Sequence, residues 1–212
     1  MIRLRLSFMA SVLTLLLAGC TSYQVSGSIP LSREEGRVAI ALDDPFGGAR
    51  LRAALPDAGL SGVFFQQANN GTSSVWRAPD ESGLVLYRGI LSATYSLGFD
   101  LYSADVSDTA ELIARRQSGT STRVHRYLDG ENQIVVRAFR CSVLVGAVSS
   151  GRYEMREECR GASADFVNSY EVTGSGEIVA SQQWVGPEVG YMQIIQLSDG
   201  RPVRSGIIAI SN

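Results

Sequence analysis

Short apolar runs separated by polar turns follow one another along most of the chain from residue 37 onward. Several runs alternate between apolar and polar residues, which is typical of half-buried strands. The turns between them are rich in Gly, Asn, Asp and Ser; Asn69-Asn70-Gly71 predicts a tight turn and Asp129-Gly130 a type I′ hairpin turn. The pattern predicts strands at residues 38–42, 62–66, 74–77, 84–87, 90–95, 122–128, 132–147, 153–159, 165–173, 177–185, 190–197 and 203–210.

Helical periodicity is weak and confined to two segments. Ala104–Arg116 is the main helical candidate, with Asp105 or Ser107 as its N-cap, although its apolar face is thin. Residues 49–55 predict a second, short helix that a proline would end. The chain is therefore expected to be all-β: a single antiparallel barrel-like or sandwich domain over residues 37–212, with one or two short helices.

The chain begins with a charged segment, an apolar run and then a cysteine. Arg3 and Arg5 precede apolar residues 6–18, followed by Gly19 and Cys20. This is the layout of a secretory signal, and the apolar run is shorter than the ~20 residues of a bilayer-spanning helix. The small residues before the cysteine resemble a bacterial lipobox, in which the thiol is acylated and the chain is cut just before it.

This resemblance predicts a signal peptide at residues 1–19 and acyl chains on Cys20, which would anchor the protein in a membrane. The alternative is a simple signal peptide followed by a chance cysteine. Residues 20–36 are polar, contain Ser, Gly and Pro and have no apolar period, so we expect a flexible tether. Because lipoproteins kept at the inner membrane commonly carry Asp after the cysteine, Thr21 favours the outer membrane, with the domain facing the periplasm.

Composition excludes several classes of protein. The formal net charge is −2, and no run of arginines exceeds two residues, so the sequence carries no footprint for nucleic acid. Phosphate-binding loops and dinucleotide fingerprints are absent, and we expect no cofactor. One domain of ordinary size fits the length that remains after the signal peptide.

Two cysteines remain after Cys20, and an exported protein with such a pair usually forms a disulfide. If the strands on either side of Ser150 form a hairpin centred on it, Cys141 lies directly opposite Cys159, within disulfide range. A metal site is not expected, because the two thiols lack His or carboxylate partners at ligand spacing. The same register pairs Val143 with Glu157 and Val145 with Met155.

Candidate catalytic groups are few. The single histidine, His125, projects from a predicted strand beside arginines and has no nucleophile motif or second histidine near it, so a structural or surface role is expected. Acidic residues occur as adjacent pairs, which are more often solvated turns than a catalytic carboxylate pair. These pairs are Asp43-Asp44, Asp80-Glu81 and Glu157-Glu158.

Aromatic side chains offer a possible contact with sugars. Trp76 and Trp184 would suit stacking on sugar rings if they were exposed, whereas packing in the core is the commoner role of tryptophan. Along strand 165–173, alternation predicts one face that combines apolar and polar side chains. That face carries Phe166, Asn168, Tyr170 and Val172.

The order and spacing of residues between 74 and 200 resemble the YjbF family of group 4 capsule polysaccharide lipoproteins. The resemblance rests on Trp76, the turn Asp80–Gly83, Leu84–Tyr87, Gly89, Thr94, Leu97-Gly98, Asp100-Leu101, Arg126–Asp129, Cys141, Glu158-Cys159, Phe166–Tyr170 and Ser181–Pro187. Residues 37–67 depart from the family pattern, in which a helix follows the tether.

The resemblance implies an outer-membrane lipoprotein encoded beside exopolysaccharide or capsule genes, with a barrel-like fold and no catalytic residues to carry over. Its implied partners are envelope proteins, including a large outer-membrane β-barrel protein. The preferred hypothesis is therefore a non-enzymatic accessory in exopolysaccharide or capsule production or export. The alternatives are a polysaccharide-binding module that uses Trp76 or Trp184 and, third in order, a glycan-modifying enzyme with a carboxylate pair.

Overall fold

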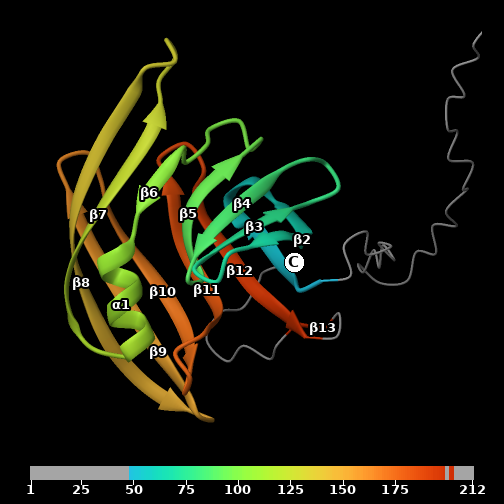
Figure 1. Ribbon diagram of the computed structural model, residues 1–212. Helices are drawn as coiled ribbons and strands as arrows, with labels where there is room; N and C mark the ends of the chain where they lie inside the picture. The colour runs from blue at the N-terminus through green and yellow to red at the C-terminus, as the bar shows by residue number, and fades with distance from the viewer. Residues whose placement is uncertain (1–47, 199–200, 203–212) are drawn as a thin grey trace, which may run out of the picture. The chain divides into compact units, whose positions relative to one another are not determined.

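Antiparallel strands make up most of the fold, as alternation in the sequence predicts (Figure 1). The computed structural model describes residues 48–198 and 201–202. The expected signal peptide, the tether and the strands expected at 38–42 and 203–210 lie outside these residues. The strands are β1 (Arg50–Leu55), β2 (Leu60–Asn69), β3 (Ser73–Arg77), β4 (Gly83–Tyr87), β5 (Ile90–Tyr95), β6 (Ser103–Asp105), β7 (Gly119–Leu128), β8 (Ile134–Ser149), β9 (Arg152–Gly161), β10 (Asp165–Thr173), β11 (Ile178–Gly186), β12 (Gly190–Ser198) and β13 (Arg201–Pro202).

The strands form one sheet in which most neighbours in sequence are also neighbours in space. The order is β5-β4-β3-β2-β1-β12-β11-β10-β9-β8-β7-β6, and every pair along it is antiparallel. Pairing of β1 with β12 brings the two ends of the described chain together and leaves β5 and β6 as the two edges. The result is a nearly closed, barrel-like sheet, which confirms the all-β, barrel-like expectation.

The gap between β5 and β6 is called the seam here. Near the C-terminal end of β5, the Thr94 N–H donates to the Leu101 carbonyl at 2.9 Å. At the start of β5 a side chain takes the place of a strand: Gln183 of β11 accepts from the Leu91 N–H at 2.8 Å and donates to the Gly89 carbonyl at 3.3 Å. These contacts satisfy backbone groups that an edge strand would otherwise leave unpaired.

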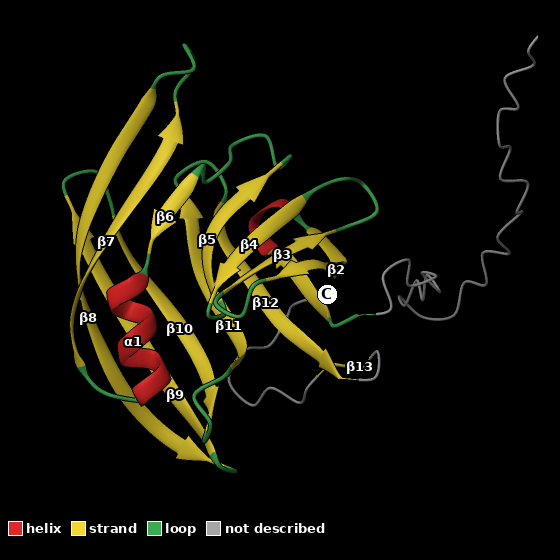
Figure 2. Cartoon of the chain, in the orientation of Figure 1, coloured by secondary structure: helices red, strands yellow, loops and turns green. Residues whose placement is uncertain are grey.

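Helix α1 (Ser107–Arg115) packs against β7 and β8 and covers part of the sheet's inner face (Figure 2). Its Ala110 and Ile113 are buried in one apolar cluster with Val143, Met155 and Tyr170. A second, larger cluster fills the space enclosed by β1–β5, β11 and β12. Among the described residues, neither helix has the length and apolarity that crossing a bilayer would require.

The prediction of a helix at residues 49–55 is wrong, because residues 50–55 form strand β1. Ala and Leu favour a helix locally, but β1 pairs with β2 on one side and β12 on the other, so tertiary contacts decide. The proline that was expected to end a helix instead begins a short 3-10 helix, η1 (Pro56–Ala58). Residues 48–67 therefore contain strands and a short 3-10 helix but no α-helix, within the segment that departs from the family pattern.

The main helix is shorter than the expected Ala104–Arg116. Residues Ser103–Asp105 pair with β7 as strand β6, so the helix begins only at Ser107. The N-cap position is occupied by Val106 and by neither of the two expected residues, Asp105 and Ser107. Asp105 instead accepts bonds from the N–H and hydroxyl of Ser107 at 3.2 and 2.8 Å.

The turn between β7 and β8 also differs from expectation. Leu128 pairs with Ile134, so the loop is longer than a two-residue type I′ turn. Its positive φ falls on Asn132, at 58°, and not on Gly130. The Asp129 carboxylate organises this loop by accepting from the N–H groups of Glu131 and Gln133 at 2.9 and 2.8 Å.

Candidate functional site

The two cysteines form the expected disulfide. Cys141 of β8 lies directly opposite Cys159 of β9, with their Cα atoms 4.0 Å apart. The pairing of Val145 with Met155 is also confirmed, and a bulge after it shifts the register by one residue toward the turn. The disulfide thus links β8, the longest described strand, to β9, and both cysteines are buried.

A carboxylate lies beside this disulfide. The sulfur atoms of Cys141 and Cys159 and the carboxylate of Glu157 lie within 4.8 Å of one another, a geometry that could suit a metal ion. The sulfurs are bonded to each other, however, and a disulfide offers no thiolate ligand. In the oxidised protein this cluster is therefore a poor metal site.

Glu157 is the centre of a fully buried polar network beneath α1. Its Oε2 accepts from Arg123 Nη1 at 2.6 Å and from Asn168 Nδ2 and the Tyr170 hydroxyl at 2.8 Å each. Its Oε1 accepts from the Thr109 hydroxyl of α1 at 2.6 Å. Glu157 and Arg123 are both 0% exposed, so neither charge is solvated by water.

The network keeps this ion pair charged. Burial alone would raise the pKa of Glu157, but the Arg123 guanidinium and the three neutral donors outweigh it and lower the pKa. Burial likewise opposes the charge on Arg123, and Glu157 more than compensates, so its pKa is raised. A carboxylate with both oxygens occupied is poorly placed to act as a general base, so this network serves the fold.

His125 is a buried structural residue and not a surface one. It is 0% exposed, and burial together with Arg123 and Arg137 lowers its pKa from 6.5 to about 2. The Tyr127 hydroxyl donates to the Val185 carbonyl at 2.8 Å, so His125 Nδ1, 2.9 Å from that hydroxyl, carries the proton and donates to it. The neutral ring packs on Phe166 and Phe139.

The two tryptophans lie in different clusters. Trp76 is 3% exposed within the larger core, and its indole N–H donates to the Ser74 hydroxyl at 2.7 Å. Trp184 is half-buried, stacks on Phe166 with ring centroids 6.0 Å apart, and contacts Tyr191 edge-on at 5.2 Å. Of the two, Trp184 is the more exposed.

The adjacent acidic residues are not arranged as a catalytic pair where the structure describes them. Glu157 points inward, whereas Glu158 lies on the opposite face and pairs with Arg156 at 2.9 Å. Glu81 pairs with Arg77 at 3.1 Å. The third pair, Asp43-Asp44, lies outside the described residues.

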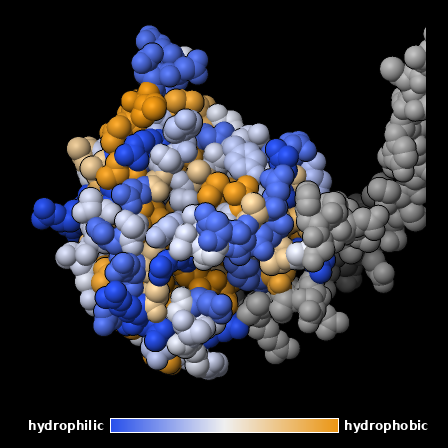
Figure 3. Space-filling view, viewed as in Figure 1, coloured by the Kyte–Doolittle hydropathy of each residue, from blue (hydrophilic) through white to orange (hydrophobic). Residues whose placement is uncertain are grey.

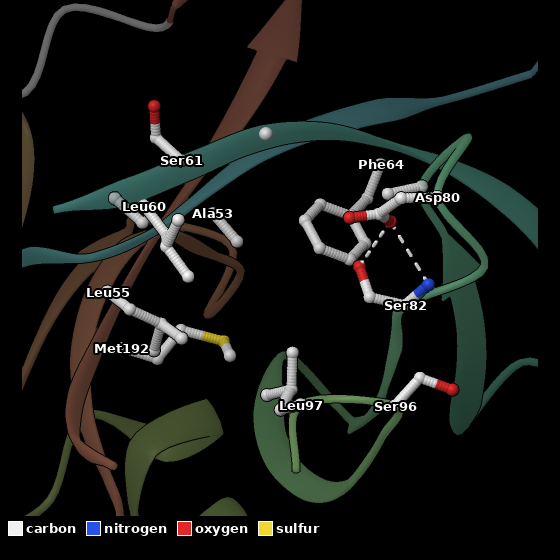
Figure 4. A pocket seen from close by; sticks show the side chains of 13 residues that line it. Ala53, Leu55, Leu60, Ser61, Phe64, Asp80, Ser82, Ser96, Leu97 and Met192 are labelled. Carbon is white, nitrogen blue, oxygen red and sulfur yellow. Dashed lines mark hydrogen bonds between the residues drawn. The ribbon is translucent and has the colours of Figure 1, made fainter. Parts of the chain in front are cut away.

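An apolar pocket opens at the end of the sheet where the β1–β2, β3–β4 and β5–β6 connections gather (Figure 4). Its volume is about 200 Å³, and Phe64, Leu97 and Met192 face into it. At its edge Asp80 accepts from the N–H and hydroxyl of Ser82 at 3.1 and 2.6 Å. These bonds from Ser82 lower the pKa of Asp80, which is ionised at neutral pH.

A second, more polar cleft lies along the seam and is called the seam cleft. Its volume is about 390 Å³. It is lined by Ser73, Tyr87, Ser92, Ala93, Ser103, Ala104, Asp105, Val106 and Ser107. The sequence offered no signal for it, because its lining comes from strands that only the closed sheet brings together.

These features define a class: a nearly closed antiparallel sheet with one helix on its inner face and a buried ion pair beneath it. The sequence pattern of the family described as "Group 4 capsule polysaccharide lipoprotein gfcB, YjbF" matches residues 46–197, and the chain belongs to this family. The match includes residues 46–67, most of the segment that departs from the expected family pattern.

A solved structure shares the fold. The hypothetical lipoprotein YmcC from Escherichia coli (K12) superposes with a TM-score of 0.61 at 18% sequence identity, covering 73% of this chain and 86% of that one. Among curated proteins, none matches the chain. Membership of the family makes this protein a capsule-type lipoprotein, which implies an envelope protein anchored to a membrane.

Proposed function

We propose that the protein is a non-enzymatic accessory in exopolysaccharide or capsule production or export, held by acyl chains on Cys20 at the periplasmic face of the outer membrane. The observation that carries this proposal is family membership over residues 46–197. The buried titratable groups support it, because Glu157, Arg123 and His125 are fully buried and none of them lines the apolar pocket or the seam cleft.

A flexible tether suits this placement. If residues 20–36 behave as a random coil, the tether has an r.m.s. reach of roughly 20–25 Å. That reach would keep the domain close to the membrane while leaving it free to turn toward a partner. The anchor therefore supplies location, and the folded domain supplies the contact surface.

The hairpin of β7 and β8 offers such a surface. Leu128, Ile134 and Val136 are 48%, 54% and 58% exposed near its tip. Figure 3 shows hydrophobic atoms gathered just below the polar tip of this hairpin. An exposed apolar patch on a projecting hairpin favours contact with another protein, and an envelope protein such as an outer-membrane β-barrel protein is the proposed partner.

Deletion of the gene tests the accessory role. We expect surface polysaccharide to fall while intracellular sugar nucleotides and lipid-linked precursors persist, because export and not synthesis would be impaired. A plasmid copy should restore export, and a Val136→Glu copy should restore less than a Ser142→Ala copy. Unchanged polysaccharide in the deletion strain would contradict the proposal.

A further inference from the structure

The seam cleft lies where a closed barrel would have a continuous ladder of strand hydrogen bonds. In the described part of the chain no ladder joins β5 to β6, so side chains of β3, β4, β5, β6 and the start of α1 line the gap. At about 390 Å³ the cleft falls within the ~300–1,000 Å³ typical of small-molecule sites. The apolar pocket, at about 200 Å³, is smaller.

Five of the nine lining residues carry a hydroxyl group. The side-chain oxygens of Ser73, Tyr87 and Ser103 have no hydrogen-bond partner among the described residues, although all three side chains are half-buried. Ser92 donates to the Val85 carbonyl at 3.1 Å and keeps its lone pairs free to accept. Hydroxyls both donate and accept, so they match the hydroxyls of a sugar ring and not an acyl chain.

The cleft carries one charge. Asp105 is exposed at its edge and accepts from Ser107, and these bonds hold its pKa below the ordinary value, with a smaller contribution from Arg126. Arg126 does not line the cleft, and none of the described residues that line it is cationic. An ionised carboxylate disfavours an acidic sugar, while the half-buried ring of Tyr87 offers an apolar surface to the C–H face of a pyranose.

We propose that the seam cleft holds a neutral sugar unit of the exported polysaccharide, with Ser73, Ser103 and Tyr87 bonding to its hydroxyls. This inference rests on the proposed function, because it assumes that the protein meets that polymer. The proposed sugar site is the seam cleft, and it does not include Trp184, which lies in the aromatic cluster of β10–β12.

Calorimetric titration of the full-length, detergent-solubilised lipoprotein tests the proposal. The probe is a set of oligosaccharides released from the polysaccharide that the same cells export, fractionated into neutral and acidic species, with hexagalacturonate as an acidic reference. We expect saturable binding of neutral species, and weaker or no binding of acidic ones. Ser103→Ala and Tyr87→Phe should each weaken binding about five-fold, since each removes one hydrogen bond.

Ser142→Ala is the matched control, because Ser142 is exposed on the outer face of β8 and should leave affinity unchanged. Absence of saturable binding, acidic species binding more tightly, or wild-type affinity in both cleft variants would overturn the proposal. Tyr87→Phe keeps the ring and its packing, so loss of binding there is not a loss of fold. If deletion reduces export but titrations are flat, only the cleft proposal fails; if titrations succeed but deletion leaves export unchanged, the accessory role fails instead.

Discussion

The most consequential residues are polar side chains buried inside the sheet. A buried ion pair survives only when its partners compensate for lost hydration, and Glu157 receives four donors for this purpose. The donors come from α1, β7 and β10, so one carboxylate joins three elements to β9. Ser121 extends the network: because Thr109 donates to Glu157, Ser121 must donate to Thr109 across 2.9 Å.

Breaking the ion pair on one side should destabilise the protein strongly. Arg123→Met or Glu157→Leu alone should lower the free energy of unfolding by about 3–5 kcal/mol, because each leaves an unpaired buried charge. The double variant should cost clearly less than the sum of the two single changes. Urea unfolding of all four proteins measures this coupling, and additive losses would show that the two side chains do not act as a pair.

His125 should make the protein sensitive to mild acid. Its pKa is about 2 in the fold and near 6.5 when unfolded, so the unfolded state alone takes up a proton as pH falls below 6.5. Its contribution to stability is complete above pH 6.5 and declines by about 1.4 kcal/mol per pH unit below it. From pH 7 to pH 5 the wild type should therefore lose about 2 kcal/mol more than His125→Phe.

Unfolding free energies of both proteins at several pH values provide the measurement. Carboxylates titrate alike in the two proteins, so their contribution cancels in the difference. Parallel curves for wild type and variant would show that His125 is already charged or exposed in the folded protein.

At the scale of elements, the weak point of the sheet is the seam between β5 and β6. Gln183 is 0% exposed and binds backbone groups at the start of β5, while Ser181 accepts its remaining N–H at 2.9 Å. A side chain thus performs the role that a neighbouring strand performs elsewhere. The β8–β9 hairpin has the opposite character, since a disulfide and a long ladder reinforce it.

Gln183→Met should loosen the start of β5. The change leaves the Leu91 N–H and the Gly89 carbonyl without partners, at a cost of about 1–3 kcal/mol per buried group. Hydrogen exchange at the Leu91 amide should accelerate, whereas β8 and β9 amides should change little relative to global stability. Gln182→Met, on the opposite face of β11, is the control; equal protection of Leu91 in both variants would contradict the role given to Gln183.

Loss of the disulfide should lower stability by about 3 kcal/mol, mainly by freeing the unfolded chain. Denaturant unfolding with and without reductant measures the effect. The double variant Cys141→Ala/Cys159→Ala should be insensitive to reductant and close to the reduced wild type. A wild type equally stable in both conditions would count against a stabilising role.

At the scale of the whole molecule, location and folding are expected to be separable. The sheet, its apolar clusters and its polar network form from contacts among residues 48–198. The lipid would therefore decide where the protein resides without deciding how the domain folds. Partner contact and export depend on both.

Replacing Cys20, the residue proposed to be acylated, tests this separation. Cys20→Ser should move the protein from the envelope pellet to the soluble periplasmic fraction and abolish palmitate labelling. The domain of the variant should still form its disulfide and melt as the wild type does, and Thr21→Ser serves as a neutral neighbour. A variant that pellets like wild type would refute the proposed anchor.

Local pattern sufficed for much of this protein. Alternation located most of the described strands, identified the inward face of β10, and set the β8–β9 register that brings Cys141 opposite Cys159. These features depend on neighbours a few residues apart, or on a hairpin whose turn lies between its strands. An alternation of period two and a turn at the centre of a hairpin are therefore enough to predict strand positions, inward faces and the register of that hairpin.

Tertiary structure alone decided the rest. Residues 50–55 have helix-forming composition and become β1 because β2 and β12 flank them, a pairing between distant parts of the chain. The Arg123–Glu157 contact requires α1, β7, β9 and β10 to meet, and the seam cleft requires a sheet that almost closes. Sequence determined where strands can form and which faces they bury; closure of the sheet determined which buried polar groups meet, because burial leaves each of them only the partners that the fold supplies.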